Sequence, residues 1–358
     1  MWLLLAAAVG GAACAPDKKQ VTPPEQSHPA TNAVYYWKTV FDPDSAEIDF
    51  LRVHRVGRVY LRLFDVVENR GATPGEETVV PNATLVDKAL KHGSEGYARD
   101  LLNRTEFVPV VYITLDALKA ITGREGMLAE KIVERVKNMC SYNEIPNVGE
   151  LQLDCDWTES TGPSYFKLCD EVKRQIKSQN LRWDLSSTIR LHQLRTEAPR
   201  VDRGVLMVYN TGSFDNPRAR NSIIDEEDVK PYLKYLDKYP LPLDVAYPTY
   251  SWQLLFRGPR FAGIMSGLDT SDTILFTPGP DNSVIVRQDF PYRNRVIRKG
   301  DVFRDEKSDI AEILKVKNRI ERELAGKPHT NIIYHLDSRN LSDYTENEIN
   351  SLYSKNAR

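Results

Sequence analysis

The chain has 358 residues, 41% hydrophobic and 27% charged, which is ordinary for a globular protein and enough for one large domain or two smaller ones. Its formal net charge of -2 gives no electrostatic bias toward nucleic acid, so we expect no nucleic-acid partner. Its four cysteines form no CxxC pair, which excludes a zinc-type spacing and a disulfide-rich scaffold, and we expect Cys140, Cys155 and Cys169 to be buried as small apolar residues.

The first 14 residues, MWLLLAAAVGGAAC, are apolar, too short to span a bilayer comfortably, and typical of an export signal. Their ending, Gly-Ala-Ala-Cys, resembles the lipobox of bacterial lipoproteins, which implies lipidation of Cys14. Two features depart from that pattern: Gly11 stands where Leu is usual, and no Lys or Arg precedes the apolar run. The alternative is an ordinary secretory signal, although cleavage after Ala15 would leave Pro16 first. We expect an exported, lipid-anchored protein of the bacterial envelope, on its periplasmic or cell-surface side.

Residues 15–32 are polar and rich in proline, which predicts a flexible tether. From there to residue 358 the chain alternates short apolar strands with amphipathic helices. Strands are predicted at 33–41, 58–67, 106–118, 151–160, 185–194, 203–212, 242–252 and 330–338. Helices are predicted at 45–57, with Ser45 as its cap and Gly57 as its end, near 83–103, and at 126–140, 164–179, 225–239, 308–326 and 345–353.

Eight strand–helix alternations predict parallel strands with helical crossovers, and eight units in this length fit a single (β/α)8 TIM barrel over 33–358. An open doubly wound sheet is the alternative, but no GxGxxG follows the first strand to support a dinucleotide site. An insertion at about 257–305, between strand seven and its helix, contains segments typical of one or two β-hairpins. It would lie over the carboxyl end of the barrel, as a lid, a binding wall or a decoration.

Polar and aromatic residues gather at the end of nearly every predicted strand, where the active sites of such barrels lie. On the second to eighth strands they are Arg62, Asp65, Tyr112, Asp116, Asp154, Asp156, Trp157, Arg190, His192, Gln193, Tyr209, Asn210, Tyr247, Tyr250, Trp252, His335 and Asp337. Each strand is apolar at its start and polar or aromatic at its end. A purely structural barrel would not need this direction, so the pattern predicts a binding or catalytic site.

Strand four, LQLDCDW, carries two aspartates on one face. With a period of two, Leu151, Leu153 and Cys155 face the helices, and Asp154 and Asp156 face the lumen. Two neighbouring carboxylates raise the pKa of one of them. The alternative is a structural ion pair with Arg62 or Arg190, which is also compatible with a working site.

Aromatic residues are expected to ring the mouth of the barrel, although core packing is the alternative for each one. They are Trp37, Trp157, Tyr209, Tyr247, Tyr250 and Trp252. Aromatic faces stack on the C–H surfaces of sugar rings while polar groups bind the hydroxyls. Together with the acids and amides, they predict a carbohydrate cleft.

LQLDCDW resembles the DxxDxDxE signature of the chitinase-like, family 18 glycoside hydrolases, and LMVYNTG resembles their strand-six motif. The resemblance covers residues 33–345 as architecture but only about 15 residues as motif. It implies that Asp156 stabilises the acetamido group of the substrate, that Tyr209 hydrogen-bonds it, and that Asn210 takes an Asp/Asn position. It also extends to bacterial lipoproteins with such a barrel.

The sequence departs from that family at important positions. Leu151 stands at the first aspartate, and Thr158 stands at the general-acid glutamate, with Glu159 one residue late. The tryptophan expected at the end of strand eight is replaced by YHLDS. Because a missing general acid costs about 10²–10⁴ in rate, either Glu159, Asp156 or Asp337 replaces it or the barrel binds sugar without cleaving it.

The leading hypothesis is glycoside hydrolysis by paired carboxylates, without a cofactor. Asp156 or Glu159 would be the acid and Asp154 its partner, while the orienting residues would be Tyr209, Arg190, Gln193 and Asn210. The first alternative is a non-catalytic glycan-binding lipoprotein. The second is a metal-dependent hydrolase with ligands Asp154, Asp156, His192 and His335, although no HxH or HxxxH spacing occurs.

Overall fold

The computed structural model describes residues 31–73, 75–91, 93, 95–216, 219–280, 282–324 and 326–355. The predicted signal segment with Cys14, and residues 15–30 of the predicted tether, lie outside this part of the chain. Within the described residues, no helix is long and apolar enough to cross a membrane.

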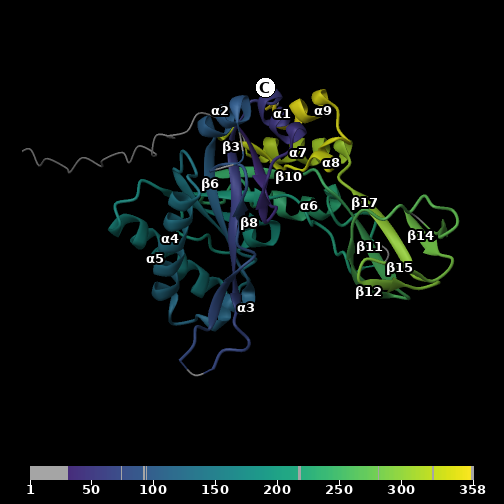
Figure 1. Cartoon of the computed structure of the whole chain (residues 1–358), viewed down its shortest axis with the longest axis horizontal. Helices are drawn as coiled ribbons and strands as arrows, with labels where there is room; N and C mark the ends of the chain where they lie inside the picture. The colour runs from purple at the N-terminus through teal and green to yellow at the C-terminus, as the bar shows by residue number, and fades with distance from the viewer. Residues whose placement is uncertain are drawn as a thin grey trace, which may run out of the picture.

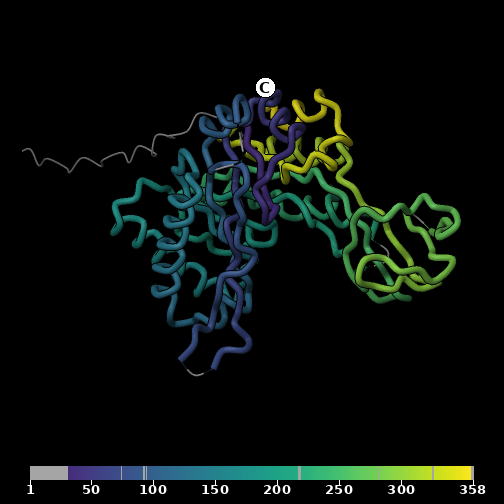
Figure 2. Tube along the Cα trace, viewed as in Figure 1, coloured from purple at the N-terminus to yellow at the C-terminus, as the bar shows by residue number. Residues whose placement is uncertain are grey.

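Eight parallel strands close into a barrel, because β1 pairs with both β3 and β18. This confirms the predicted (β/α)8 TIM barrel. Figure 2 shows the closure as the first, purple strand beside the last, yellow part of the chain. The strands are β1 (Asn32–Tyr36), β3 (Val56–Glu68), β6 (Glu106–Ile113), β7 (Glu150–Asp154), β8 (Asp184–Arg190), β9 (Arg203–Met207), β10 (Leu243–Pro248) and β18 (Asn331–Tyr334).

Helices cover the outside of the barrel (Figure 1). They are α1 (Ser45–Val53), α2 (Gly96–Arg104), α3 (Leu115–Ala120), α4 (Glu125–Tyr142), α5 (Gly162–Ser178), the 3-10 helix η1 (Leu191–Arg195), α6 (Glu226–Leu233), α7 (Ile310–Glu323), α8 (Ser338–Leu341) and α9 (Glu346–Tyr353). Three short strands lie in the connections: β2 (Val40–Phe41), β4 (Val79–Asn82) and β5 (Val86–Asp87).

Several predicted boundaries were wrong. Asp44, not Ser45, caps α1, because its side chain accepts the backbone N–H of Glu47 over 2.9 Å. The helix ends at Val53, and Gly57 belongs to β3. The second helix begins at residue 96 rather than 83, and strand five ends at Arg190, where η1 begins.

The barrel interior and the space under the helices form two separate apolar cores, as strand alternation requires. The interior core contains Ala33, Tyr35, Tyr60, Val108, Val110, Val205, Met207, Ala246 and Ile332. Leu151, Leu153 and Cys155 belong to the outer core, which confirms the predicted facing of strand four. The three described cysteines are free and buried, also as predicted.

The insertion is larger than predicted and forms a lobe of its own, at the right of Figure 1. A five-stranded antiparallel sheet has the order β12-β11-β17-β14-β13, and a hairpin of β15 and β16 packs beside it. The strands are β11 (Ser251–Arg257), β12 (Arg260–Met265), β13 (Phe276–Pro278), β14 (Ser283–Val286), β15 (Phe290–Tyr292), β16 (Arg295–Ile297) and β17 (Val302–Lys307). Predicted strand seven therefore ends at Pro248, and its last residues belong to the lobe.

The loop between β9 and α6 attaches the lobe to the barrel. The ring of Phe214 packs edge-on against Phe261, with centroids 5.0 Å apart. Asn221 donates to the backbone oxygen of Lys307 over 2.8 Å, and Arg304 donates to that of Asn216 over 2.6 Å. These contacts fix the lobe beside the carboxyl end of the barrel.

Candidate functional site

The two aspartates of strand four are bridged by one guanidinium. Arg190, at the end of β8, donates from Nη2 to Asp154 Oδ1 over 3.0 Å and from Nε to Asp156. Thr188 donates to the same oxygen of Asp154 over 2.6 Å. Burial raises the pKa of Asp154, and the Arg190 charge opposes that rise. Of the two partners suggested by the sequence, Arg190 forms the ion pair.

Arg62 has a different partner. It forms a bidentate pair with Asp65 three residues later in β3, and its guanidinium lies over the Trp37 ring, 5.1 Å from the centroid. Tyr112 lies opposite Asp154 in the register of β6 and β7. Burial and then the nearby charge of Asp156 raise the pKa of Tyr112 to about 12. These four predicted residues therefore do lie at the mouth, around the acidic pair.

An aromatic group covers the rest of the mouth. The rings of Tyr209 and Tyr334 stack with centroids 4.4 Å apart, and Tyr250 packs edge-on against both. Trp37 lies 5.9 Å from Tyr334, and Trp252 lies 5.5 Å from Tyr250. Arg190 joins the two halves of the mouth, because its guanidinium also lies 5.9 Å from the centre of the Tyr209 ring.

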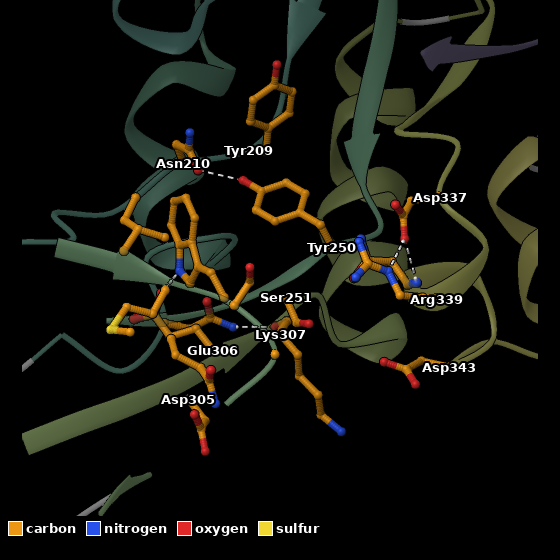
Figure 3. A pocket seen from close by; sticks show the side chains of 18 of the residues that line it. Tyr209, Asn210, Tyr250, Ser251, Asp305, Glu306, Lys307, Asp337, Arg339 and Asp343 are labelled. Carbon is orange, nitrogen blue, oxygen red and sulfur yellow. Dashed lines mark hydrogen bonds and ion pairs between the residues drawn. The ribbon is translucent and has the colours of Figure 1, made fainter. Parts of the chain in front are cut away.

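A cleft of about 1250 Å³ runs between this aromatic group and the inserted lobe. Figure 3 shows Tyr250 pointing across it toward Asn210, to which its hydroxyl donates over 2.5 Å. The opposite wall comes from β17, where the buried Glu306 accepts from Trp252 Nε1 over 2.7 Å and from Arg304 Nε over 2.7 Å. The cleft is thus lined by aromatic rings and by polar groups whose positions are fixed by hydrogen bonds.

Two predicted residues of strand eight also line the cleft. Burial lowers the pKa of His335 to about 4, so its imidazole is neutral at pH 7. Asp337 caps α8 by accepting the backbone N–H of Asn340 over 3.4 Å, and Lys38 lies 3.4 Å from its carboxylate. Although burial opposes it, the Lys38 charge helps to hold the pKa of Asp337 below its ordinary value.

The prediction that Trp157 and Tyr247 ring the mouth is wrong. Trp157 is buried in the outer core against Tyr165 and Phe166, because the chain turns toward α5 after β7 ends. Tyr247 is also fully buried there, because it alternates with Ala246, which faces the lumen.

Gln193 and His192 do not lie on a strand as expected but in η1. Gln193 is fully buried and donates to the backbone oxygen of Trp157 over 2.9 Å. It also accepts from the backbone N–H of Arg190 over 2.7 Å, so it holds the loop that carries Arg190. His192 is exposed. Gln193 therefore supports the site without reaching the cleft.

The metal hypothesis has no ligand set in the described part of the chain, where no group of three His, Cys, Asp or Glu side chains is placed so that it could hold a metal ion. Asp154 and Asp156 are bound to Arg190 instead. A cation at this position would have to displace that guanidinium.

No family model matches the chain, and no curated protein matches its sequence. Among solved structures, a chitinase from Chromobacterium violaceum ATCC 12472 is similar with a TM-score of 0.53 at 11% identity, over 91% of this chain and 100% of that one. The fold is a chitinase-like TIM barrel. Two further solved structures are similar. One is the Bacillus cereus spore cortex-lytic enzyme SleL, with a TM-score of 0.48 at 14% identity, over 88% of this chain and 74% of that one. The other is a GH18 chitinase from Cycas revoluta in complex with (GlcNAc)3, with a TM-score of 0.49 at 13% identity, over 90% of this chain and 99% of that one.

In this chitinase-like barrel, Thr158 and Glu159 lie beyond the end of β7, and both are exposed. Thr158 Oγ1 lies 3.1 Å from the Ser160 hydroxyl, so it is part of the turn that leads to α5. Neither Thr158 nor Glu159 lines the cleft. The position at which the sequence resemblance places a general acid therefore has no carboxylate, and the next carboxylate along the chain, Glu159, is on the surface.

Sequence reasoning missed several cleft residues of this chitinase-like barrel, above all Tyr334. It is in the YHLDS segment, where the family's tryptophan was expected, and its ring occupies the centre of the aromatic group. The available signal was that Tyr334 is aromatic, like the tryptophan expected at this end of strand eight. Asp305 and Glu306 were missed because only the docking of the lobe brings β17 to the mouth.

Proposed function

We propose that this chain is a glycan-binding protein that uses the cleft between the barrel mouth and the inserted lobe, and that it does not cleave its ligand. Its export and its lipid anchor at Cys14 belong to the same proposal and rest on the residues of the first 14 positions. The binding cleft and the absence of cleavage are supported by different parts of the site.

The cleft itself is the observation that carries the binding proposal. Tyr209, Tyr250, Trp252 and Tyr334 all line it, and such rings offer flat apolar surfaces to the C–H faces of a pyranose. Between them lie fixed polar groups such as Asn210, which suit the hydroxyls of a sugar. A volume of about 1250 Å³ accommodates several sugar residues.

The ion pairs of Arg190 support binding without cleavage. General acid catalysis needs a carboxyl group that is protonated and within reach of the glycosidic oxygen. Asp154 is buried, and both aspartates are held by one cation. Thr158 stands at the acid position, and neither aspartate of strand four is free of Arg190.

Hydrolysis is the second candidate, and one observation favours it. The Asp156 side chain is 45% exposed at the mouth, so a ligand that displaces Arg190 would meet its carboxylate. Glu159 is exposed nearby in the chain and would then be the remaining acid.

A glycan screen that records both binding and released reducing ends separates the two candidates. Wild type, Asp156→Asn and Tyr250→Ala are compared as full-length chains. The proposal expects binding without product from wild type and weaker binding from Tyr250→Ala. Product from wild type that Asp156→Asn abolishes would instead establish the hydrolase.

A further inference from the structure

The inserted lobe carries a line of arginines that starts at the cleft and runs along β12. Arg293 donates to the backbone oxygen of Ser266, a cleft residue, over 2.9 Å. Arg295 donates over 3.3 Å to the backbone oxygen of Ala262, which lies in β12 four residues before Ser266; Ser266 directly follows that strand. Four residues of a β-strand span about 13 Å. Arg293 and Arg295 therefore mark two points along one edge of the lobe.

A separate hollow of about 400 Å³ lies at the far end of this line. It is lined by Arg257, Arg295 and Arg298 together with the apolar residues Leu255, Ala262 and Val296. Arg257 is oriented by a 2.8 Å hydrogen bond to the backbone oxygen of Val296. Three arginines therefore line one small hollow.

Gly263 makes room for this arrangement. A Cβ on this residue would lie 2.7 Å from Arg295 Nη1, and its φ of +149° is one that other residues rarely adopt. The strand thus lets a guanidinium pack directly on its backbone.

The charges of the line are poorly compensated within the described residues. Asp301 is 3.3 Å from Arg257, and no described carboxylate lies within 4.0 Å of the guanidinium groups of Arg293, Arg295 and Arg298. Asp289, in the loop after β14, accepts from the backbone N–H of Lys299. Neighbouring like charges repel one another, and a bound anion would remove that cost.

We propose that this arginine line, Arg257, Arg293, Arg295 and Arg298, binds the anionic groups of an acidic glycan whose chain continues into the cleft. The inference rests on the proposed glycan-binding function and adds the ligand class, a polysaccharide with carboxylate or sulfate groups. Guanidinium groups bind both kinds of anion through paired N–H donors. A line of positive charges beside a sugar-binding cleft selects a charged polymer over a neutral one of the same shape.

Two matched ligand pairs test the proposal on the full-length chain: oligogalacturonate against its methyl ester, and dextran sulfate against dextran. The pairs separate carboxylate from sulfate, and each keeps the sugar backbone constant. Wild type is expected to bind the charged member of at least one pair at least tenfold more tightly at 50 mM salt. That preference should shrink at 1 M salt because ions screen the contacts.

The decisive variant is Arg293→Gln/Arg295→Gln/Arg298→Gln. It leaves Arg257 unchanged, because Arg257 donates to the backbone of Val296 in the hairpin of β15 and β16. It should lose most of the preference, whereas the triple Arg→Lys variant should keep part of it. The control, Arg174→Gln/Arg200→Gln/Arg322→Gln, removes the same charge from exposed positions outside the lobe. If the control lost the preference for the charged ligand to the same extent, the preference would depend on the net charge of the protein alone, and the proposal would be overturned.

Two other results would count against the arginine line, and a separate variant tests the cleft. No preference for either charged member in wild type, or an unchanged preference in the Gln variant, overturns the arginine line. Tyr250→Ala tests the cleft separately. If it leaves all glycan binding unchanged while the Gln variant abolishes polyanion binding, the proposed cleft function fails and the arginine line stands.

Discussion

Arg190 holds Asp154 and Asp156 at once, 3.0 Å from Nη2 to the buried carboxylate and through Nε to the half-exposed one. The pair that looks catalytic in the sequence is therefore also a structural tie between β7 and β8. A buried ion pair is costly to break from one side, because the remaining charge loses its partner. The same guanidinium would have to move before the buried Asp154 met a ligand.

Replacement of Arg190 by glutamine is expected to lower the free energy of unfolding by about 3–5 kcal/mol, because Asp154 is left buried without its counter-charge. The double variant Arg190→Gln/Asp154→Asn should recover much of that loss. Denaturant unfolding of the three proteins measures both effects. As a control, Arg174→Gln removes an exposed pair with Glu171 and should cost about 1 kcal/mol or less. A cost that small for Arg190→Gln would contradict the structural role.

Tyr250 is expected to bind sugar with its ring rather than with its hydroxyl. Tyr250→Ala removes the ring from the cleft wall and should raise the Kd for a bound glycan at least tenfold, about 1.4 kcal/mol. Tyr250→Phe keeps the ring and loses only the hydrogen bond to Asn210, so its Kd should stay within about threefold of wild type. Calorimetric titration gives both constants. If both variants lost the same affinity for the glycan, the binding contribution of Tyr250 would come from its hydroxyl and the hydrogen bond to Asn210 and not from its ring.

Much of the architecture is encoded locally, and the sequence predicts it for that reason. Strand alternation with helices requires only the period of apolar residues, and the facing of Leu151, Leu153 and Asp154 follows from the same period. The rule fails where the strand ends. Trp157 lies three residues beyond β7, where the chain has turned and alternation no longer applies.

The cleft was only half predictable for a related reason. Its barrel side comes from strand ends, whose order along the chain gives their order around the mouth. Its other side depends on how the lobe docks through Phe214 and Arg304, which no local pattern encodes. Tyr247 differs from both cases, because its facing opposite to Ala246 was available from alternation within β10.

Trp157 is expected to affect stability and not binding. Trp157→Ala leaves a large cavity beside Tyr165 and Phe166 and should cost about 3–5 kcal/mol in unfolding free energy. Trp157→Phe keeps most of the packing and should cost less while leaving the glycan Kd unchanged. The phenylalanine variant is therefore the one to titrate. If Trp157→Phe clearly lost affinity for the glycan without losing stability, Trp157 would be part of the binding site after all.

Cys14 is expected to anchor the protein. Cys14→Ser should move the chain from the membrane fraction to the soluble fraction, because lipidation requires the thiol. Cys140→Ser, which changes a cysteine buried in the barrel domain, is the control and should leave the distribution unchanged. Fractionation followed by mass measurement of the N-terminal peptide distinguishes a lipidated chain from one cleaved by an ordinary signal peptidase. An unmodified N-terminus in the wild type would contradict the anchor.

The pH dependence of stability should depend on Glu150 at the start of β7. This carboxyl is fully buried, 3.7 Å from Arg58, and burial raises its pKa to about 7. In the unfolded chain its pKa is about 4.3. Between these two pH values the folded state keeps the proton that the unfolded state releases, so stability falls as pH rises from about 4.5 to 7. At about 1.36 kcal/mol per pH unit the contribution is about 3 kcal/mol.

Glu150→Gln removes this titration, so the difference in unfolding free energy between wild type and variant should change by about 3 kcal/mol across pH 4.5 to 7 and then level off. His335 acts with the opposite sign, because its lowered pKa of about 4 makes stability fall as pH drops below about 6.5. Both proteins contain His335, so the difference isolates Glu150. Glu130→Gln, at an exposed position of α4, should run parallel to wild type. A Glu150→Gln curve that also runs parallel would show that Arg58 keeps this carboxylate ionised in the folded barrel.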